Sequence, residues 1–252
     1  DLSVLRQTML FTALETVSYN INRKKQNLNF CEFGKTYQRT KSEYSEFKHL
    51  SLIVTGIRNE NSWISPSKPT DFYFLKAAVE LVLERLGIVD YQSSFKQNNI
   101  FLEGLCLKKN NAELVSFGMV QKSVLKEFDI KQDVFYADFN WDELSEIIRN
   151  SKIIFENIPR YPEVKRDLAL LLDNNISFDE IKTIAYDTER NLLKNITLFD
   201  VYTGKNLPPE KKSYAVGFTI GDPRKTLTDK QIDKIMKKLQ QRFEKELGAE
   251  LR

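Results

Sequence analysis

Residues that bind metals or form crosslinks are scarce in this sequence. It has two cysteines, Cys31 and Cys106, and one histidine, His49, among 252 residues. Both cysteines lie inside apolar runs, which favours buried, reduced thiols over a disulfide or a metal site. His49 follows Lys48 and precedes Leu50, and we predict that it is a strand-edge residue. We therefore expect no metal site in this chain.

Long apolar runs are also missing. No segment approaches the roughly 18 to 20 apolar residues that a membrane-spanning helix needs, and no basic lead followed by an apolar stretch opens the chain. We expect a cytoplasmic protein with no membrane partner. The chain starts at Asp1 rather than at methionine and enters a helical pattern at once, so we expect a fragment of a longer protein.

Glycine patterns that bind phosphate are absent as well. The nine glycines never follow the Gly-x-Gly-x-x-Gly or P-loop spacing. A Ser/His/Asp triad would need His49, and nothing beside it in the sequence supports that role. Glu32, Asp71 and Glu103 are isolated carboxylates, which are usually caps or solvated charges rather than acid/base pairs or Mg2+ ligands. We predict no catalytic residue.

The excess of positive charge lies in the last part of the chain. From Ile158 to Arg252 there are 18 Lys and Arg against 15 Asp and Glu, and the rest of the chain has 20 of each. Such a modest excess is typical of a protein that contacts phosphates in one patch.

The segment 158–252 has the strand–helix–strand–strand–helix–strand order of a ferredoxin-like domain. Apolar or alternating runs predict strands at 168–172, 196–202 and 213–220, and a short last strand at Leu251. Many unrelated functions share this order, so the order alone does not identify one.

Two helices of this segment have clear boundaries in the sequence. Ser177 and Glu180 form the capping box of the first helix. Thr228 begins the second helix, and Gly248 ends it as a C-cap. A lysine-rich stripe lies opposite the apolar face of the second helix, and solvated surface is its simplest interpretation.

The segment 1–152 is predicted to be a second α+β domain. Apolar spacing from Leu2 to Ile21 predicts a helix of about five turns. Another helix is expected to begin near Asp71 and end at 86–88, and a third to span 142–149. Strands are expected at 30–37, 49–57, 100–107, 113–120 and 134–139.

Four spaced blocks of the second segment closely resemble the anticodon-binding domain of the bacterial phenylalanyl-tRNA synthetase beta subunit. These blocks are Tyr161–Ala169, Leu198–Gly204, Lys211–Ser213 and Pro223–Asp229. The first segment resembles the synthetase-like domain of the same family through Leu2–Leu10, Asn20, Phe30–Tyr37 and Asp71–Lys76. It departs from the family at Gln121-Lys122, where His-Pro is common, so the loop geometry there is not carried over.

The resemblance implies an α+β architecture with a class II synthetase-like antiparallel sheet and helices, followed by a βαββαβ domain. In this family the synthetase-like domain has lost catalysis and serves as a scaffold for the catalytic alpha subunit. The implied enzyme is an alpha2beta2 ligase that joins phenylalanine to tRNA(Phe) with ATP and Mg2+. No cofactor is implied for this chain itself, and no DNA partner.

Ala169, Asp200, Tyr202 and Ser213 are predicted to form an anticodon-binding pocket. Unstacked loop bases are bound by aromatic rings and by hydrogen bonds to their edges, and these residues supply a ring, an acceptor and a small donor on adjacent strands. The resemblance also implies anticodon contact at these four positions. In the alternative interpretation, Asp200 caps a turn and Tyr202 packs in the core.

If these four residues form the pocket, three basic residues are predicted to contact phosphates, namely Arg166, Lys212 and Arg224. A rival function remains open at this point. The chain could be a stand-alone regulatory or scaffold module whose ferredoxin-like domain binds a small ligand or a protein.

Overall fold

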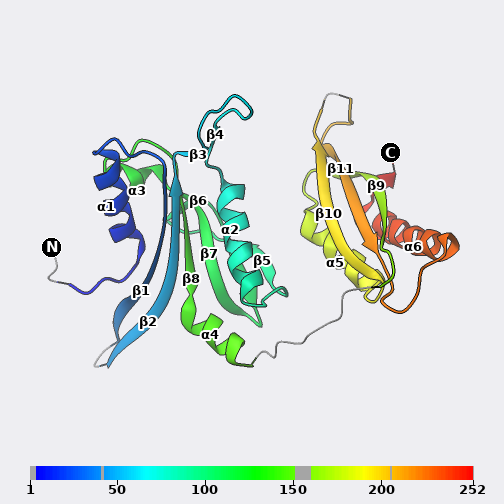
Figure 1. The fold of residues 1–252 in the computed structure, drawn as a ribbon, viewed down its shortest axis with the longest axis horizontal. Helices are drawn as coiled ribbons and strands as arrows, with labels where there is room; N and C mark the ends of the chain where they lie inside the picture. Colours follow the sequence, from blue (N-terminus) through cyan, green and yellow to red (C-terminus); the bar gives the residue numbers. More distant parts are fainter. Residues whose placement is uncertain (1–3, 41–42, 151–159, 205, 252) are drawn as a thin grey trace. The chain divides into compact units, whose positions relative to one another are not determined.

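A computed structural model describes residues 4–40, 43–150, 160–204 and 206–251. The chain forms two compact units, residues 1–154 and 155–252 (Figure 1). Leu2, where the first helix was expected to begin, and the expected domain limits at 152 and 158 lie outside the described residues. No helix in the described ranges is long and apolar enough to cross a membrane.

The first unit is built on a six-stranded antiparallel sheet in the order β1-β2-β8-β7-β6-β5. Its strands are β1 (Leu28–Thr40), β2 (Glu43–Thr55), β8 (Val134–Asn140), β7 (Ala112–Val120), β6 (Phe101–Lys109) and β5 (Gln92–Phe95). A separate two-stranded ribbon joins β3 (Ile57–Asn59) to β4 (Lys68–Pro69).

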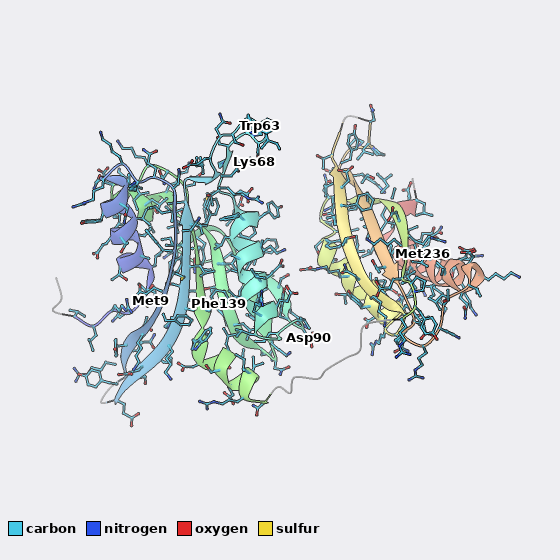
Figure 2. All side chains as sticks on the ribbon, viewed as in Figure 1. Met9, Trp63, Lys68, Asp90, Phe139 and Met236 are labelled. Carbon is cyan, nitrogen blue, oxygen red and sulfur yellow. The ribbon has the colours of Figure 1, made fainter. Side chains whose placement is uncertain are left out.

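Helices cover both faces of this sheet, because the strands carry apolar residues on both sides. On one face, α1 (Leu10–Ile21) and α3 (Lys122–Glu127) pack over a core that includes Met9, while α2 (Phe72–Arg85) and α4 (Trp141–Asn150) pack on the other over a core that includes Phe139 (Figure 2). As predicted, the Asp71 carboxylate caps α2 by accepting a 2.8 Å hydrogen bond from the backbone of Phe74.

The second unit has the predicted βαββαβ order. It runs through β9 (Val164–Asp173), α5 (Phe178–Thr188), β10 (Leu193–Tyr202), β11 (Lys211–Ile220), α6 (Asp229–Leu247) and β12 (Glu250–Leu251). Its antiparallel sheet has the order β10-β11-β9-β12. Together with the first unit, this confirms the predicted α+β fold class.

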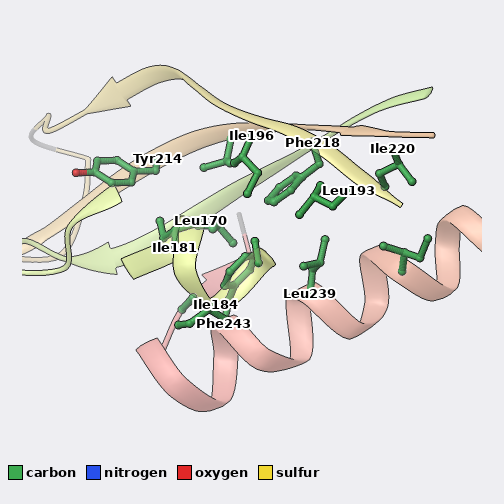
Figure 3. Close-up of a cluster of buried hydrophobic side chains, with 14 of the residues drawn as sticks. Leu170, Ile181, Ile184, Leu193, Ile196, Tyr214, Phe218, Ile220, Leu239 and Phe243 are labelled. Atoms are coloured by element: carbon green, nitrogen blue, oxygen red, sulfur yellow. The ribbon is translucent and has the colours of Figure 1, made fainter. Parts of the chain in front are cut away.

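Both helices of the second unit pack on the same face of its sheet. Leu170 and Phe218 from the strands meet Ile184 from α5 and Leu239 and Phe243 from α6 in one buried cluster (Figure 3). Each fully buried side chain of this size contributes about 1.5–3 kcal/mol to folding. Because successive strand residues point to opposite faces, the residues between these core positions point away from the helices.

The predicted helix boundaries of this unit are confirmed. The backbone N–H of Ser177 donates to Glu180 Oε2 at 2.7 Å, and Glu180 N–H donates to Ser177 Oγ at 3.3 Å, which completes the capping box. At the other end of the unit, Gly248 takes the left-handed conformation at φ +60° that ends α6.

The first helix is shorter than predicted. It begins at Leu10, and the segment before it runs along β1, where the Arg6 carbonyl accepts a 3.0 Å hydrogen bond from Tyr37 and Arg6 Nε donates to the carbonyl of Lys35 at 2.8 Å. Asn20 lies inside the helix and donates to the carbonyl of Thr16 at 2.8 Å. Pairing with the strand outweighs the helical spacing of the apolar residues there.

Two predictions for single side chains in the first unit are wrong. Cys106 is buried as expected, but Cys31 is exposed, because its side of β1 near the sheet edge is not fully covered. His49 is not a strand-edge residue, since β2 lies between β1 and β8 and is hydrogen-bonded on both sides.

Candidate nucleic-acid interface

The face of the second sheet that points away from α5 and α6 carries small and polar residues. Along β11, Ala215, Gly217 and Thr219 alternate with the buried core residues Val216 and Phe218. We call this surface the open face. It includes Lys165, Asp167, Ala169, Leu171, Thr197, Phe199, Asp200, Tyr202, Lys211, Ser213, Ala215, Gly217 and Thr219.

The strand register brings the four predicted pocket residues together on the open face. Asp200 pairs with Ala215, and Ala215 pairs with Ala169, so these three form one row across three strands. Tyr202 pairs with Ser213 two residues further along, which is the same side of the sheet. The ring and the carboxylate therefore lie at neighbouring positions of one surface, and Ser213 lies beside them, largely buried at 8% exposure.

Tyr202 does not pack in the core. Its side chain is 39% exposed, and a Cβ atom on Gly204 would collide with its phenol ring, so the ring lies against the glycine backbone. A side chain at position 204 would displace the ring. The alternative interpretation of Tyr202 as a core residue is therefore wrong, and one face of the sheet offers an accessible aromatic ring.

A β-bulge in β10 adds a residue that the sequence pattern did not indicate. The register shifts between Leu198, which pairs with Val216, and Asp200, which pairs with Ala215. Phe199 is the extra residue, and its ring is 61% exposed. Phe199 Cδ1 lies 3.7 Å from the position that a Cβ atom on Gly217 would occupy, which places the ring on the open face beside that glycine.

The charges on the middle of the open face are carboxylates. Asp200 and Asp167 are both exposed, and Asp167 Oδ1 lies 3.2 Å from the same position above Gly217. Carboxylates accept hydrogen bonds from the amino and imino groups of bases, whereas they repel phosphates. The surface is suited to base edges rather than to a nucleic-acid backbone.

The three predicted phosphate contacts do not lie with these residues. Arg166 and Lys212 alternate to the helix side of the sheet, where Arg166 Nη2 approaches Asp229 Oδ1 at 3.5 Å and Lys212 Nζ donates to the carbonyl of Asn174 at 2.9 Å. Arg224 is exposed in the loop after β11. Ser213 lies near the start of that strand, so most of the strand's length separates the two residues. The structure thus separates all three from the pocket residues.

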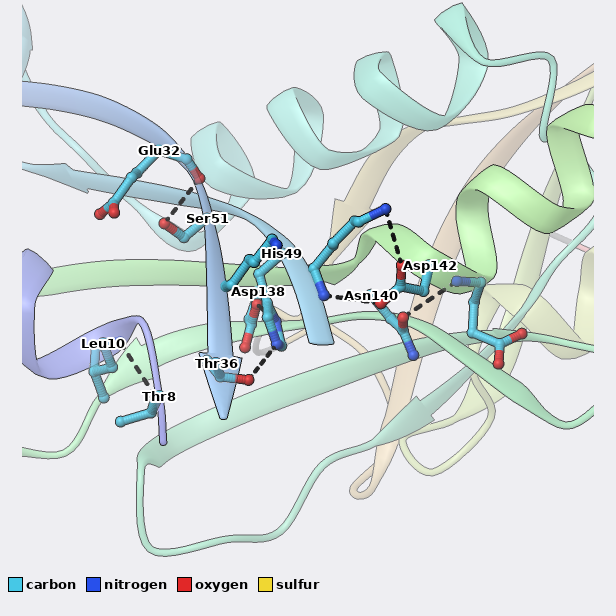
Figure 4. A network of polar contacts seen from close by, with 12 residues as sticks. Thr8, Leu10, Glu32, Thr36, His49, Ser51, Asp138, Asn140 and Asp142 are labelled. Carbon is cyan, nitrogen blue, oxygen red and sulfur yellow. Dashed lines mark hydrogen bonds and ion pairs between the residues drawn. The ribbon is translucent and has the colours of Figure 1, made fainter. Parts of the chain in front are cut away.

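His49 in the first unit is part of a polar chain that the sequence did not indicate. Its Nε2 lies 2.8 Å from Thr36 Oγ1, and its Nδ1 lies 2.7 Å from Asp138 Oδ1, across strands β1, β2 and β8 (Figure 4). Hydroxyl, imidazole and carboxylate follow the order of a catalytic triad. Thr36 is only 3% exposed, however, so a substrate cannot reach its hydroxyl, and the chain links the strands instead.

Comparison with known families assigns both parts of the chain. Residues 1–141 match the phenylalanyl tRNA synthetase beta chain CLM domain, and residues 159–252 match the ferredoxin-fold anticodon binding domain. The chain belongs to the phenylalanyl-tRNA synthetase beta chain family. The resemblance seen in the sequence blocks is thereby confirmed.

Two curated relatives are named phenylalanine–tRNA ligase beta subunit. The protein from Bacteroides thetaiotaomicron is 48% identical, and the protein from Porphyromonas gingivalis is 43% identical; both alignments cover 100% of this chain and 32% of the relative. The chain thus spans about a third of the length of these relatives. A solved pyrrolysyl-tRNA synthetase from Desulfitobacterium hafniense aligns over 58% of this chain and 50% of that chain, at 16% identity and a TM-score of 0.45.

Proposed function

We propose that this chain is the C-terminal part of a phenylalanine–tRNA ligase beta subunit and that its second unit binds the anticodon of tRNA(Phe). The observation that carries the proposal is the grouping of Ala169, Asp200, Tyr202 and Ser213 on the open face. A loop base stacks on the Tyr202 ring and Asp200 accepts hydrogen bonds from its edge, while Ser213, which is only 8% exposed, lines the floor beneath the ring. Ala169 leaves room for the base.

In this proposal the first unit is a scaffold. Large apolar side chains are exposed on it, for example Trp63 in the loop between β3 and β4 (Figure 2), Tyr73 on α2 and Phe95 on β5. Exposed apolar surface of this kind fits a protein that is covered by another subunit. The partner is the catalytic alpha subunit of an alpha2beta2 ligase in the cytoplasm, and ATP and Mg2+ act on that subunit.

Substitution of the pocket residues tests the anticodon proposal. Tyr202→Ala should weaken binding of a tRNA(Phe) transcript by about 1–3 kcal/mol, because one stacked base is lost. Asp200→Asn should reduce discrimination between this transcript and one with a changed anticodon more than it lowers affinity, because the carboxylate contacts a base edge. Binding is measured by titration of each transcript with the 252-residue protein.

Tyr186 provides a matched control. It lies on α5, on the helix side of the sheet, and it is 39% exposed, the same as Tyr202. Tyr186→Ala should therefore leave tRNA binding unchanged. If folded Tyr202→Ala and Asp200→Asn proteins bind both transcripts as the parent does, the anticodon pocket is not on this face.

A further inference from the structure

A second group of side chains on the open face has the same composition as the proposed pocket. Around Gly217, Thr197 Oγ1 lies at 2.9 Å, Asp167 Oδ1 at 3.2 Å and Phe199 Cδ1 at 3.7 Å from the position that a Cβ atom on that glycine would take. A ring, a carboxylate and a hydroxyl thus converge on a residue that has no side chain. The surface between them is backbone.

The fold does not use Phe199 for its core. The ring is absent from the buried cluster between the sheet and the helices, and it is 61% exposed, more than Tyr202. Phe199 lies two residues from Thr197 and so shares its face by alternation, and the bulge places Asp200 on that face as well although it directly follows Phe199. An apolar ring kept in water at a bulge is a feature that folding alone does not require.

The group lies one step along the strands from the proposed pocket. Gly217 is two residues from Ala215, and Thr197 and Asp167 pair with Gly217 in the register. Tyr202 pairs with Ser213, which is four residues from Gly217 along β11, so the two rings start from rows about 13 Å apart, about four times the 3.4 Å spacing of stacked bases in one strand. Two bases of one loop reach both positions only when the loop is unstacked. The surface between the two rings is free of large side chains, because it is formed by Ala169, Ala215 and Gly217.

We propose that Phe199, Asp167 and Thr197 form a second nucleobase position, which binds another base of the loop that places a base on Tyr202. The ring stacks on the base, and the Asp167 carboxylate accepts a hydrogen bond from an amino or imino N–H on its edge, so the position distinguishes bases by the donors that they present. This inference rests on the proposed anticodon function and adds a specificity-determining residue to it.

The test uses single abasic substitutions at each anticodon position of the tRNA(Phe) transcript. With the parent protein, the abasic site facing Phe199 should weaken binding about 5- to 100-fold. Phe199→Leu, which keeps apolar volume without a ring, should cause a similar loss with intact tRNA and no further loss at that abasic position. Phe199→Tyr should bind within about twofold of the parent, because the ring is retained. Asp167→Asn should change the relative affinities of transcripts that differ only in the base at the same position, because the carboxamide also presents a donor.

A structural role for the ring gives different results. If Phe199 only shields Gly217, Phe199→Leu will melt at a lower temperature but bind intact tRNA as the parent does, and every abasic substitution will cost the same in both proteins. Parent-like binding of intact tRNA by Phe199→Leu, or equal abasic costs in the two proteins, overturns the inference. If Phe199→Leu does not fold, Asp167→Asn decides, and an unchanged base preference rejects the second position. Loss of binding in Tyr202→Ala together with normal binding in Phe199→Leu rejects this inference alone, whereas normal binding in both rejects the anticodon proposal.

Discussion

The two cysteines differ in the environment of their sulfur atoms. Cys106 is buried, and burial raises the pKa of its thiol to about 11, with the Glu113 carboxylate adding to the effect. Since only the thiolate reacts with alkylating reagents, about one Cys106 thiol in a thousand is reactive at pH 8. Cys31 is exposed on β1.

We therefore expect iodoacetamide at pH 8 to modify Cys31 well before Cys106 in the folded protein. Peptide mass spectrometry over time measures both positions in one sample. Cys31→Ser should leave the protein almost unlabelled on the time scale that modifies the parent, and unfolding in urea should make Cys106 reactive. Equal rates for the two cysteines in the native protein would contradict the assignment.

Residue by residue, strand alternation explains which site residues were predictable. Asp200 and Tyr202 are two apart on one strand, so their common face follows from the period of two. The same period places Arg166, three residues before Ala169, on the opposite face of the sheet. Phe199 could not be predicted, because strict alternation turns it away from Asp200 and only the bulge brings both to one face.

At the scale of elements, boundaries marked by local chemistry were predicted well, and those decided by tertiary contacts were not. Ser177 and Gly248 satisfy backbone groups within their own helices, so the sequence is sufficient to place them. The start of α1 depends instead on hydrogen bonds between Arg6 and β1, which no local pattern records. The short strand β5 and the helix α3 were missed for a similar reason, since each forms against a neighbouring element.

The capping box of α5 makes part of the stability pH-dependent. Hydrogen bonds from the Ser177 backbone, and next from its hydroxyl, lower the pKa of Glu180. A carboxylate whose pKa is lower in the folded state stabilises it above the unfolded pKa of about 4.3, and this contribution is lost as the pH falls through the folded pKa. Glu180→Gln should therefore be less stable than the parent at pH 7, and the difference should shrink toward zero as the pH falls below about 4.

Urea denaturation of both proteins from pH 7 to pH 3 measures that difference. Asp233→Asn, which removes an exposed carboxylate in α6, is the control and should give a much smaller change with pH. A stability difference for Glu180→Gln that stays constant down to pH 3 would show that the ionised carboxylate does not stabilise the helix start.

On the scale of the whole second unit, the sheet separates two chemically different surfaces. Acceptors and aromatic rings lie on the open face, while the helices on the other side carry six of the twelve lysines in residues 155–252. The stripe on α6 consists of Lys230, Lys234, Lys237, Gln241 and Lys245, all exposed. The apolar residues of α6, including Ile232 and Leu239, face the sheet, so the stripe points away from the open face.

This arrangement predicts that the lysine stripe does not contribute to anticodon binding. At physiological ionic strength charges are screened over about 8 Å, and a helix layer about 10 Å thick separates the stripe from the open face. Lys234→Gln with Lys237→Gln should therefore leave both the affinity for tRNA(Phe) and its salt dependence unchanged.

Lys165 is the matched contrast, because it is exposed on the open face, where it pairs with Thr219. If its ammonium group contacts a loop phosphate, Lys165→Gln should reduce the slope of log K against log salt by about 0.7. Titrations at several salt concentrations give both slopes, and a flattened slope in the Lys234/Lys237 double variant would mean that the RNA backbone also crosses the helix side of this domain.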